Sequence, residues 1–146
     1  MRLQRIASLL VVVVLLVSCA ARPASLSTRE TVGRWVTKGP HGEQGTIDFD
    51  GDRTFVGNEL PGNDFFSGNT AESDGPADWG SQDRIAGTWD LWKDSASNEF
   101  YVKVDITGRL GGTKFIVGSA GDELTLEYPV GHIDDGNYVT FRHAAG

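Results

Sequence analysis

Apolar and polar residues alternate along most of the chain after residue 32, which is the period of a half-buried β-strand. The clearest run places Phe100, Val102, Val104 and Ile106 on one side and polar residues between them. No stretch after the N-terminal segment keeps a helical period. The pattern predicts eight strands, near residues 32–37, 44–50, 53–57, 84–92, 98–106, 113–118, 123–128 and 138–142.

Turn residues separate the predicted strands. The run Asp50-Gly51-Asp52 lies between two apolar runs and predicts a hairpin, and glycine-rich turns also precede three of the later strands. Short strands joined by sequential hairpins predict an all-β fold, a single antiparallel meander closed into a small barrel. Closure is favoured because it removes the exposed edges that would invite aggregation.

The segment from residue 58 to residue 83 interrupts this rhythm. It is rich in Gly, Asn, Asp and Ser, yet it carries Phe65, Phe66 and Trp79. A loop of this length is either functional or disordered. The aromatic residues are interpreted as a plug for one end of the barrel, or as a folded flap with a helical turn over 63–67 that binds a ligand or partner.

Two tryptophans in one predicted strand point to opposite faces. Trp89 shares its face with Leu91 and is predicted to lie in the core. Trp92, three positions later, is predicted to point outward. An outward tryptophan is typical of a binding surface, so Trp92 is a candidate contact for a ligand or partner; the alternative is that the long segment covers it.

The N-terminus has the order of a secretory signal. Arg2 and Arg5 precede an apolar run over residues 6–17, and small residues follow. A plain signal peptide and an uncleaved membrane anchor are the alternatives. The anchor is disfavoured because the run is shorter than the roughly 20 residues that span a bilayer. We expect a signal peptide over 1–18, a flexible tether over 19–31 and the barrel domain over 32–146.

The stretch Leu16-Val17-Ser18-Cys19 resembles the bacterial lipobox. That resemblance implies a diacylglycerol on the Cys19 thiol and cleavage just after Ser18. Cys19 is the chain's only cysteine, so no disulfide can form within the chain. A lone thiol in an oxidising compartment is a liability unless it is consumed, and acylation would consume it.

The composition is that of one acidic globular domain. The chain has 146 residues and a net charge of −7. Loss of the signal segment with Arg2 and Arg5 would bring the charge to −9. A domain with this charge is repelled by nucleic acid. Its overall acidity does not attract an anionic bilayer either, so membrane affinity must come from the lipid.

Two resemblances bear on the fold. The Gly33-x-Trp35 and Gly87-Thr88-Trp89 pieces resemble the opening motif of lipocalin barrels, which implies an interior cavity for a small apolar ligand. A small eight-stranded barrel can instead be filled by its own side chains. The wider order of motifs resembles small actinobacterial lipoproteins of unknown function; this implies the fold and the anchor but no activity. The matching stretches are 33–35, 48–55, 60–61, 87–91 and 122–126.

Catalytic and metal-binding motifs are not recognisable in the sequence. Asp48, Asp50, Asp52 and Glu59 partly match a calcium loop, but Arg53 stands where that loop needs glycine. We therefore interpret them as the polar face of a hairpin. The three histidines are scattered, and no nucleophile or phosphate motif occurs. No catalytic residue, metal or cofactor is predicted.

These observations predict a lipid-anchored, non-catalytic lipoprotein of the cell envelope. It would lie on the extracytoplasmic face of the cell membrane, attached through Cys19, and would bind an envelope protein or a small ligand. The alternatives are a lipocalin-like carrier of a small apolar molecule and an inhibitor of an exported enzyme.

Overall fold

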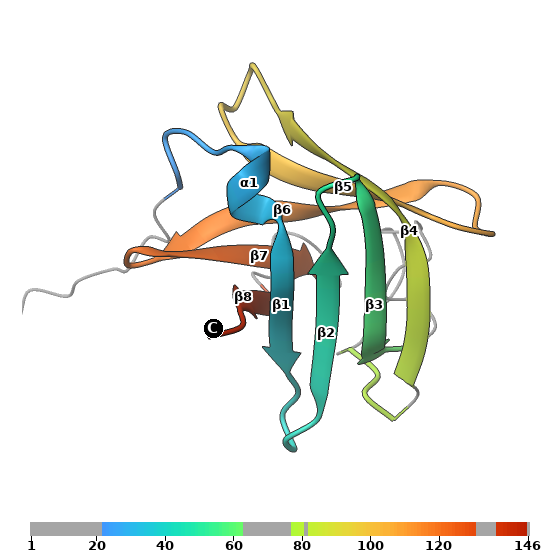
Figure 1. The fold of residues 1–146 in the computed structure, drawn as a ribbon. Coiled ribbons are helices and arrows are strands. Elements are labelled where there is room, and N and C mark those ends of the chain that lie inside the picture. Colours follow the sequence, from blue (N-terminus) through green and yellow to red (C-terminus); the bar gives the residue numbers. More distant parts are fainter. Residues whose placement is uncertain (1–21, 63–76, 81, 131–136, 146) are drawn as a thin grey trace, which may run out of the picture.

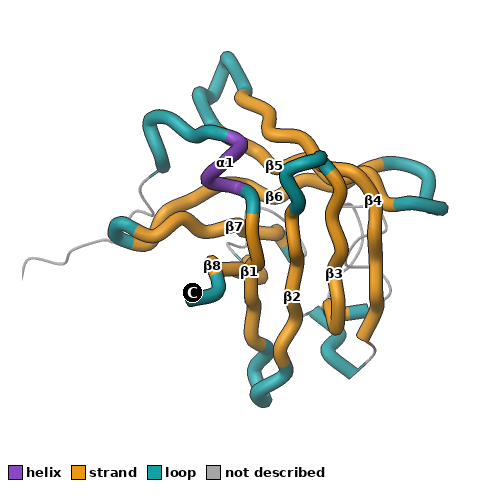
Figure 2. Tube along the Cα trace, viewed as in Figure 1, coloured by secondary structure: helices purple, strands orange, loops and turns teal. Residues whose placement is uncertain are grey.

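The computed structural model describes residues 22–62, 77–80, 82–130 and 137–145 (Figure 1). Within these residues the chain forms one helical turn and eight strands, which Figure 2 distinguishes by colour. The eight predicted strands are confirmed. The elements are α1 (Thr28–Thr31), β1 (Gly33–Lys38), β2 (Gln44–Phe49), β3 (Thr54–Pro61), β4 (Gln82–Lys93), β5 (Phe100–Ile106), β6 (Gly112–Ala120), β7 (Glu123–Pro129) and β8 (Tyr138–His143).

The strands form a closed antiparallel barrel, as the sequence predicted. Each strand pairs with the next one along the chain, and β8 pairs with β1 to close the sheet. In this β1–β8 seam the register joins Trp35 to His143 and Val36 to Arg142. Closure therefore depends on residues from opposite ends of the domain.

The predicted hairpin after β2 is confirmed in detail. The Asp50 N–H donates to the Thr54 carbonyl at 2.9 Å. The Asp52 carboxylate accepts hydrogen bonds from the Thr54 N–H at 3.0 Å and from the Thr54 hydroxyl at 2.6 Å. These bonds, the hydroxyl's first, lower the pKa of Asp52 because they favour its charged form. Arg53 completes the turn with a left-handed φ of 74°.

The barrel interior is occupied by the barrel's own side chains. On β3, a Cβ added to Gly57 would lie 2.5 Å from Leu60 Cδ1 and 2.9 Å from Ile85 Cγ1, so no methyl group fits there. This filling is what a small eight-stranded barrel permits. The largest fully buried side chains include Trp35, Phe49, Phe55, Phe115, Phe141, Ile47, Leu60 and Leu126.

Two boundaries differ from the expected ones. Within the stretch expected as a tether, residues 19–31, α1 occupies Thr28–Thr31 and Thr31 is buried. A single helical turn is too short to leave a periodic pattern. The strand expected to end at residue 57 continues as β3 to Pro61, because an irregularity between Gly57 and Leu60 shifts the register. A bulge of this kind breaks the alternation on which the prediction relied.

Candidate functional site

The helix α1 covers one end of the barrel, beside the β2–β3 turn (Figure 1). The N–H and hydroxyl of Ser27 donate to the Glu30 carboxylate at 2.8 and 2.6 Å and fix the start of the helix. The side-chain bond is the main reason that the pKa of Glu30 is lowered. The Trp35 indole N–H donates to the Thr31 carbonyl at 2.9 Å, which ties the helix to the core.

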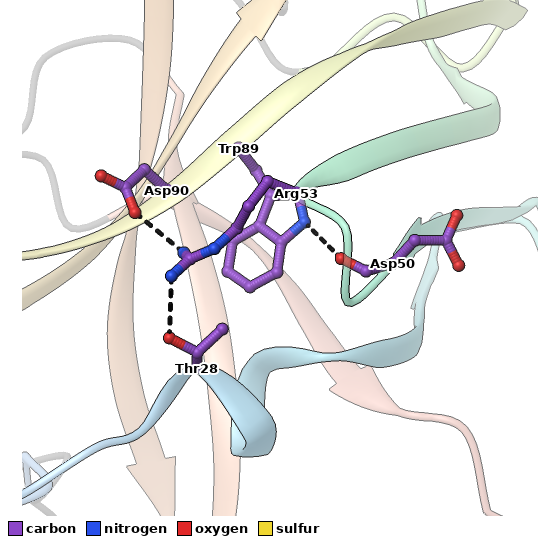
Figure 3. A network of polar contacts seen from close by, with 5 residues as sticks. All are labelled: Thr28, Asp50, Arg53, Trp89 and Asp90. Atoms are coloured by element: carbon purple, nitrogen blue, oxygen red, sulfur yellow. Dashed lines mark hydrogen bonds and ion pairs between the residues drawn. The ribbon is translucent and has the colours of Figure 1, made fainter.

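A second tryptophan fixes the same end of the barrel (Figure 3). The Arg53 guanidinium lies 4.9 Å from the Trp89 ring centroid and donates to Asp90 at 2.8 Å and to the Thr28 hydroxyl at 3.1 Å. The Trp89 indole N–H donates to the Asp50 carbonyl at 3.0 Å. The turn, the helix and β4 are thereby joined, so we interpret this end as a structural closure rather than a ligand entrance.

Three large side chains lie in a row on the outside of the barrel, across β4, β5 and β6. The register places Trp92 beside Tyr101, and Tyr101 beside Ile116. Trp92 exposes 40% of its surface, whereas Tyr101 and Ile116 each expose 7%. The Trp92 and Tyr101 ring centroids lie 5.6 Å apart. The outside of this antiparallel sheet, which would ordinarily be polar, therefore carries an apolar strip.

Two lysine ammonium groups lie over this strip. The Lys103 Nζ is 4.3 Å from the Trp92 ring centroid, and the Lys114 Nζ is 4.4 Å from the Tyr101 ring centroid. Such cation–π contacts hold a positive charge at the surface without a carboxylate partner. The group is called the lysine–aromatic face below and consists of Trp92, Tyr101, Lys103, Lys114 and Ile116.

Lysines and arginines have different partners in this domain. Lys93, at the end of β4, lies over the Phe100 ring at 5.1 Å. The register pairs it with Phe100, a core residue, so it takes the opposite side of the sheet from Trp92 and is not part of the lysine–aromatic face. Across the described part of the chain, all five ion pairs are formed by arginines. The remaining lysine, Lys38, is the last residue of β1, which is not one of the three strands that form the lysine–aromatic face. Lys103 and Lys114 therefore have aromatic rings as partners, in place of the carboxylates that the arginines of the described ion pairs contact.

The N-terminal segment reaches the same region. Arg22, the first described residue, forms an ion pair with Glu99. Glu99 also accepts a hydrogen bond from the Tyr101 hydroxyl. In Figure 1 this segment and the β4–β5 hairpin lie at the same end of the barrel. The chain therefore enters the domain beside the lysine–aromatic face.

A surface hollow of about 670 Å³ runs along the β1–β8 seam. Within it, Arg142 donates to Glu123 at 3.0 Å. Phe141, which precedes Arg142 in β8, is fully buried, so the hollow is a groove on the outside of a packed core. Its lining residues are Val36, Thr37, Lys38, Gln44, Glu123, Thr140, Arg142, His143, Ala144 and Ala145.

The acidic run after residue 47 is used for structure. The Asp48 carboxylate accepts two hydrogen bonds from the Arg34 guanidinium, at 2.7 and 3.0 Å, and Asp52 is bound to Thr54. Among the residues that the structure describes, no three His, Cys, Asp or Glu side chains are grouped so as to hold a metal ion.

Inside the barrel, burial raises the pKa of Tyr128, so its hydroxyl stays neutral at ordinary pH.

The predicted binding residues have different outcomes. The outward position of Trp92 is confirmed, while its binding role stays a prediction. Trp79 is partly buried near the β1–β2 turn, where a Cβ on Gly39 would lie 2.8 Å from its ring. Phe65, Phe66 and the helical turn expected over 63–67 lie outside the described residues.

The lysines of the lysine–aromatic face were not identified from the sequence. The alternation of β5 marks Lys103 as outward, but nothing along the chain shows that Lys103 and Lys114 lie over rings of neighbouring strands. That arrangement depends on the register between β4, β5 and β6. If the strand order is assumed, outward residues that face each other on neighbouring strands could have suggested this arrangement of lysines over rings.

Cys19 lies outside the described residues, and no helix among those described is long and apolar enough to cross a membrane. Comparisons with protein-family models, with curated proteins and with solved structures gave no match. Function is therefore inferred from the residues themselves.

Proposed function

We propose that this chain is a lipid-anchored, non-catalytic binding module of the cell envelope, held at the extracytoplasmic face of the membrane through Cys19. The observation that carries the proposal is the N-terminal order of basic residues, apolar run and Leu16-Val17-Ser18-Cys19. This order resembles the signal of bacterial lipoproteins. The resemblance to small actinobacterial lipoproteins belongs to the same proposal and supplies no activity.

A binding role on the outside of the barrel is supported by the packing inside it. Phe49, Phe115 and Phe141 expose 1% of their surface or less. A side chain that lined an empty ligand cavity would retain accessible surface. Packing among the described residues thus favours an outer binding surface over the lipocalin-like carrier. Among the described residues, Trp92 is a large apolar side chain that exposes 40% of its surface there.

The anchor is tested by replacing the thiol. We expect Cys19→Ser to abolish incorporation of a labelled fatty acid and to leave the precursor uncleaved in cells that process lipoproteins. The uncleaved variant should remain in the membrane fraction only through its apolar segment over residues 6–17 and should carry no lipid label. The reason is that acyl chains contribute roughly 0.8 kcal/mol for each buried methylene, and serine cannot form the thioether.

Ser18→Ala is the matched control because it keeps a small residue before the cysteine. It should be labelled, cleaved and partitioned like the parent chain. Unchanged labelling and processing of the Cys19→Ser chain would contradict the anchor.

A further inference from the structure

We propose that the lysine–aromatic face docks on the anionic surface of the bilayer to which the chain is anchored. The docking would fix the orientation of the barrel on the membrane. This inference rests on the proposed function, since it needs the lipid on Cys19 to bring the domain to the bilayer. The ligand chemistry is that of an acidic phospholipid headgroup with the adjoining acyl boundary.

The side chains of the face suit the membrane interface. A tryptophan ring prefers the boundary between headgroups and acyl chains, and Trp92 is the exposed ring here. Lysines place their apolar stems along such a ring and their ammonium groups toward the headgroups. Lys103 and Lys114 lie at 4.3 and 4.4 Å over the rings of Trp92 and Tyr101. The exposed ring of Trp92 therefore lies beside the positive charge of the two lysines.

The position of the anchor brings this face to the bilayer. Arg22 is bound to Glu99, whose carboxylate also accepts the Tyr101 hydroxyl of the face. Cys19 precedes Arg22 by three residues, and three residues of extended chain span about 11 Å at most. Lipid on Cys19 would thus enter the membrane near the lysine–aromatic face.

Ion pairs neutralise two of the carboxylates beside the lysine–aromatic face. The carboxylates that adjoin the face at Asp90 and Glu99 are bound to arginines. Asp105 and Glu127 flank the face on the same outer side, so the attraction comes from Lys103 and Lys114 rather than from a wholly basic surface.

The test uses the full lipidated chain reconstituted into vesicles whose acyl chains carry bromine, a quencher of tryptophan fluorescence. One set contains phosphatidylcholine alone and the other contains phosphatidylglycerol as well. We expect strong quenching only with phosphatidylglycerol, and its loss in Trp92→Phe, which assigns the signal. High salt should reduce the quenching because the headgroup attraction is screened.

Removing the lysine charges should release the face. Lys103→Gln and Lys114→Gln should each lower the docking equilibrium constant about fivefold, since each basic residue near an anionic surface contributes about that factor. Lys38→Gln is the matched control, because it removes the same charge from a strand end outside the face. Each variant is first checked for the parent's circular dichroism and melting temperature, so that a loss of docking is not a loss of folding.

Flotation of the same vesicles separates the two proposals. Protein that floats without Trp92 quenching overturns the docking and leaves the anchor intact. Protein that does not float overturns the anchor, and the docking with it. Equal quenching in both vesicle types overturns the anionic headgroup as the ligand of the face.

Discussion

At the scale of single residues, Arg53 joins more of the molecule than its position in a turn suggests. Its guanidinium contacts α1 at Thr28, β4 at Asp90, and the face of the Trp89 ring. The sequence indicated only that Arg53 excludes a calcium loop. Its cross-links could not be predicted, because they depend on where β4 and α1 lie relative to the turn.

We therefore expect Arg53→Met to lower the free energy of unfolding by about 1 to 2 kcal/mol, from an exposed ion pair and a cation–π contact. Methionine keeps the apolar stem and leaves the backbone at its positive φ. Urea unfolding followed by tryptophan fluorescence measures the change. Arg84→Met is the control: Arg84 is an exposed residue of β4 outside the described ion pairs, so about 0.5 kcal/mol or less is expected. Equal losses in both variants would mean that the network does not stabilise the closed end.

At the scale of elements, the strands were predictable and their irregularities were not. Alternation places Phe100, Val102 and Val104 inward, and the structure buries all three. The turn at Asp50–Asp52 was predictable because its turn-forming residues make local hydrogen bonds. By contrast, α1 leaves a single local signal, the Ser27–Glu30 capping box, and the irregularity in β3 leaves none that alternation can show.

The close approach at Gly57 gives a prediction for β3. Gly57→Ala should destabilise the barrel by about 1 to 3 kcal/mol, because the new methyl group overlaps Leu60 and Ile85 and forces the core to shift. Thermal unfolding monitored by circular dichroism checks this. Gly51→Ala is the matched control, since a Cβ there meets no atom within 4 Å. A Gly57→Ala chain as stable as the Gly51→Ala chain would show that space remains inside the barrel at this strand.

At the scale of the whole molecule, both the closure and the lysine–aromatic face come from pairing between strands. The meander and its closure were predicted because sequential hairpins leave edges that a barrel removes. The lysine positions over Trp92 and Tyr101 were not, since alternation fixes only which side a residue takes. The β1–β8 seam pairs residues that are far apart in the sequence, since Trp35 and His143 lie near opposite ends of the domain.

A disulfide across the seam tests this closure. In a Cys19→Ser chain, Val36→Cys with Arg142→Cys joins two residues that face each other in the register. Oxidation should stabilise this variant over its reduced form by about 2 to 4 kcal/mol, because the bond closes a loop of about a hundred residues. Urea unfolding with and without reductant measures the gain.

The comparison that decides it is a second disulfide within one hairpin, Lys38→Cys with Gln44→Cys, which also joins facing residues. Its loop is only a few residues long, so the chain-entropy account gives a gain about 2 kcal/mol smaller than at the seam. A seam disulfide that fails to form, or that strains the folded chain, would mean that β1 and β8 do not meet in this register. A gain at the seam that exceeds the hairpin gain by this amount means that β1 and β8 meet in this register without strain, so that the barrel is closed by their pairing.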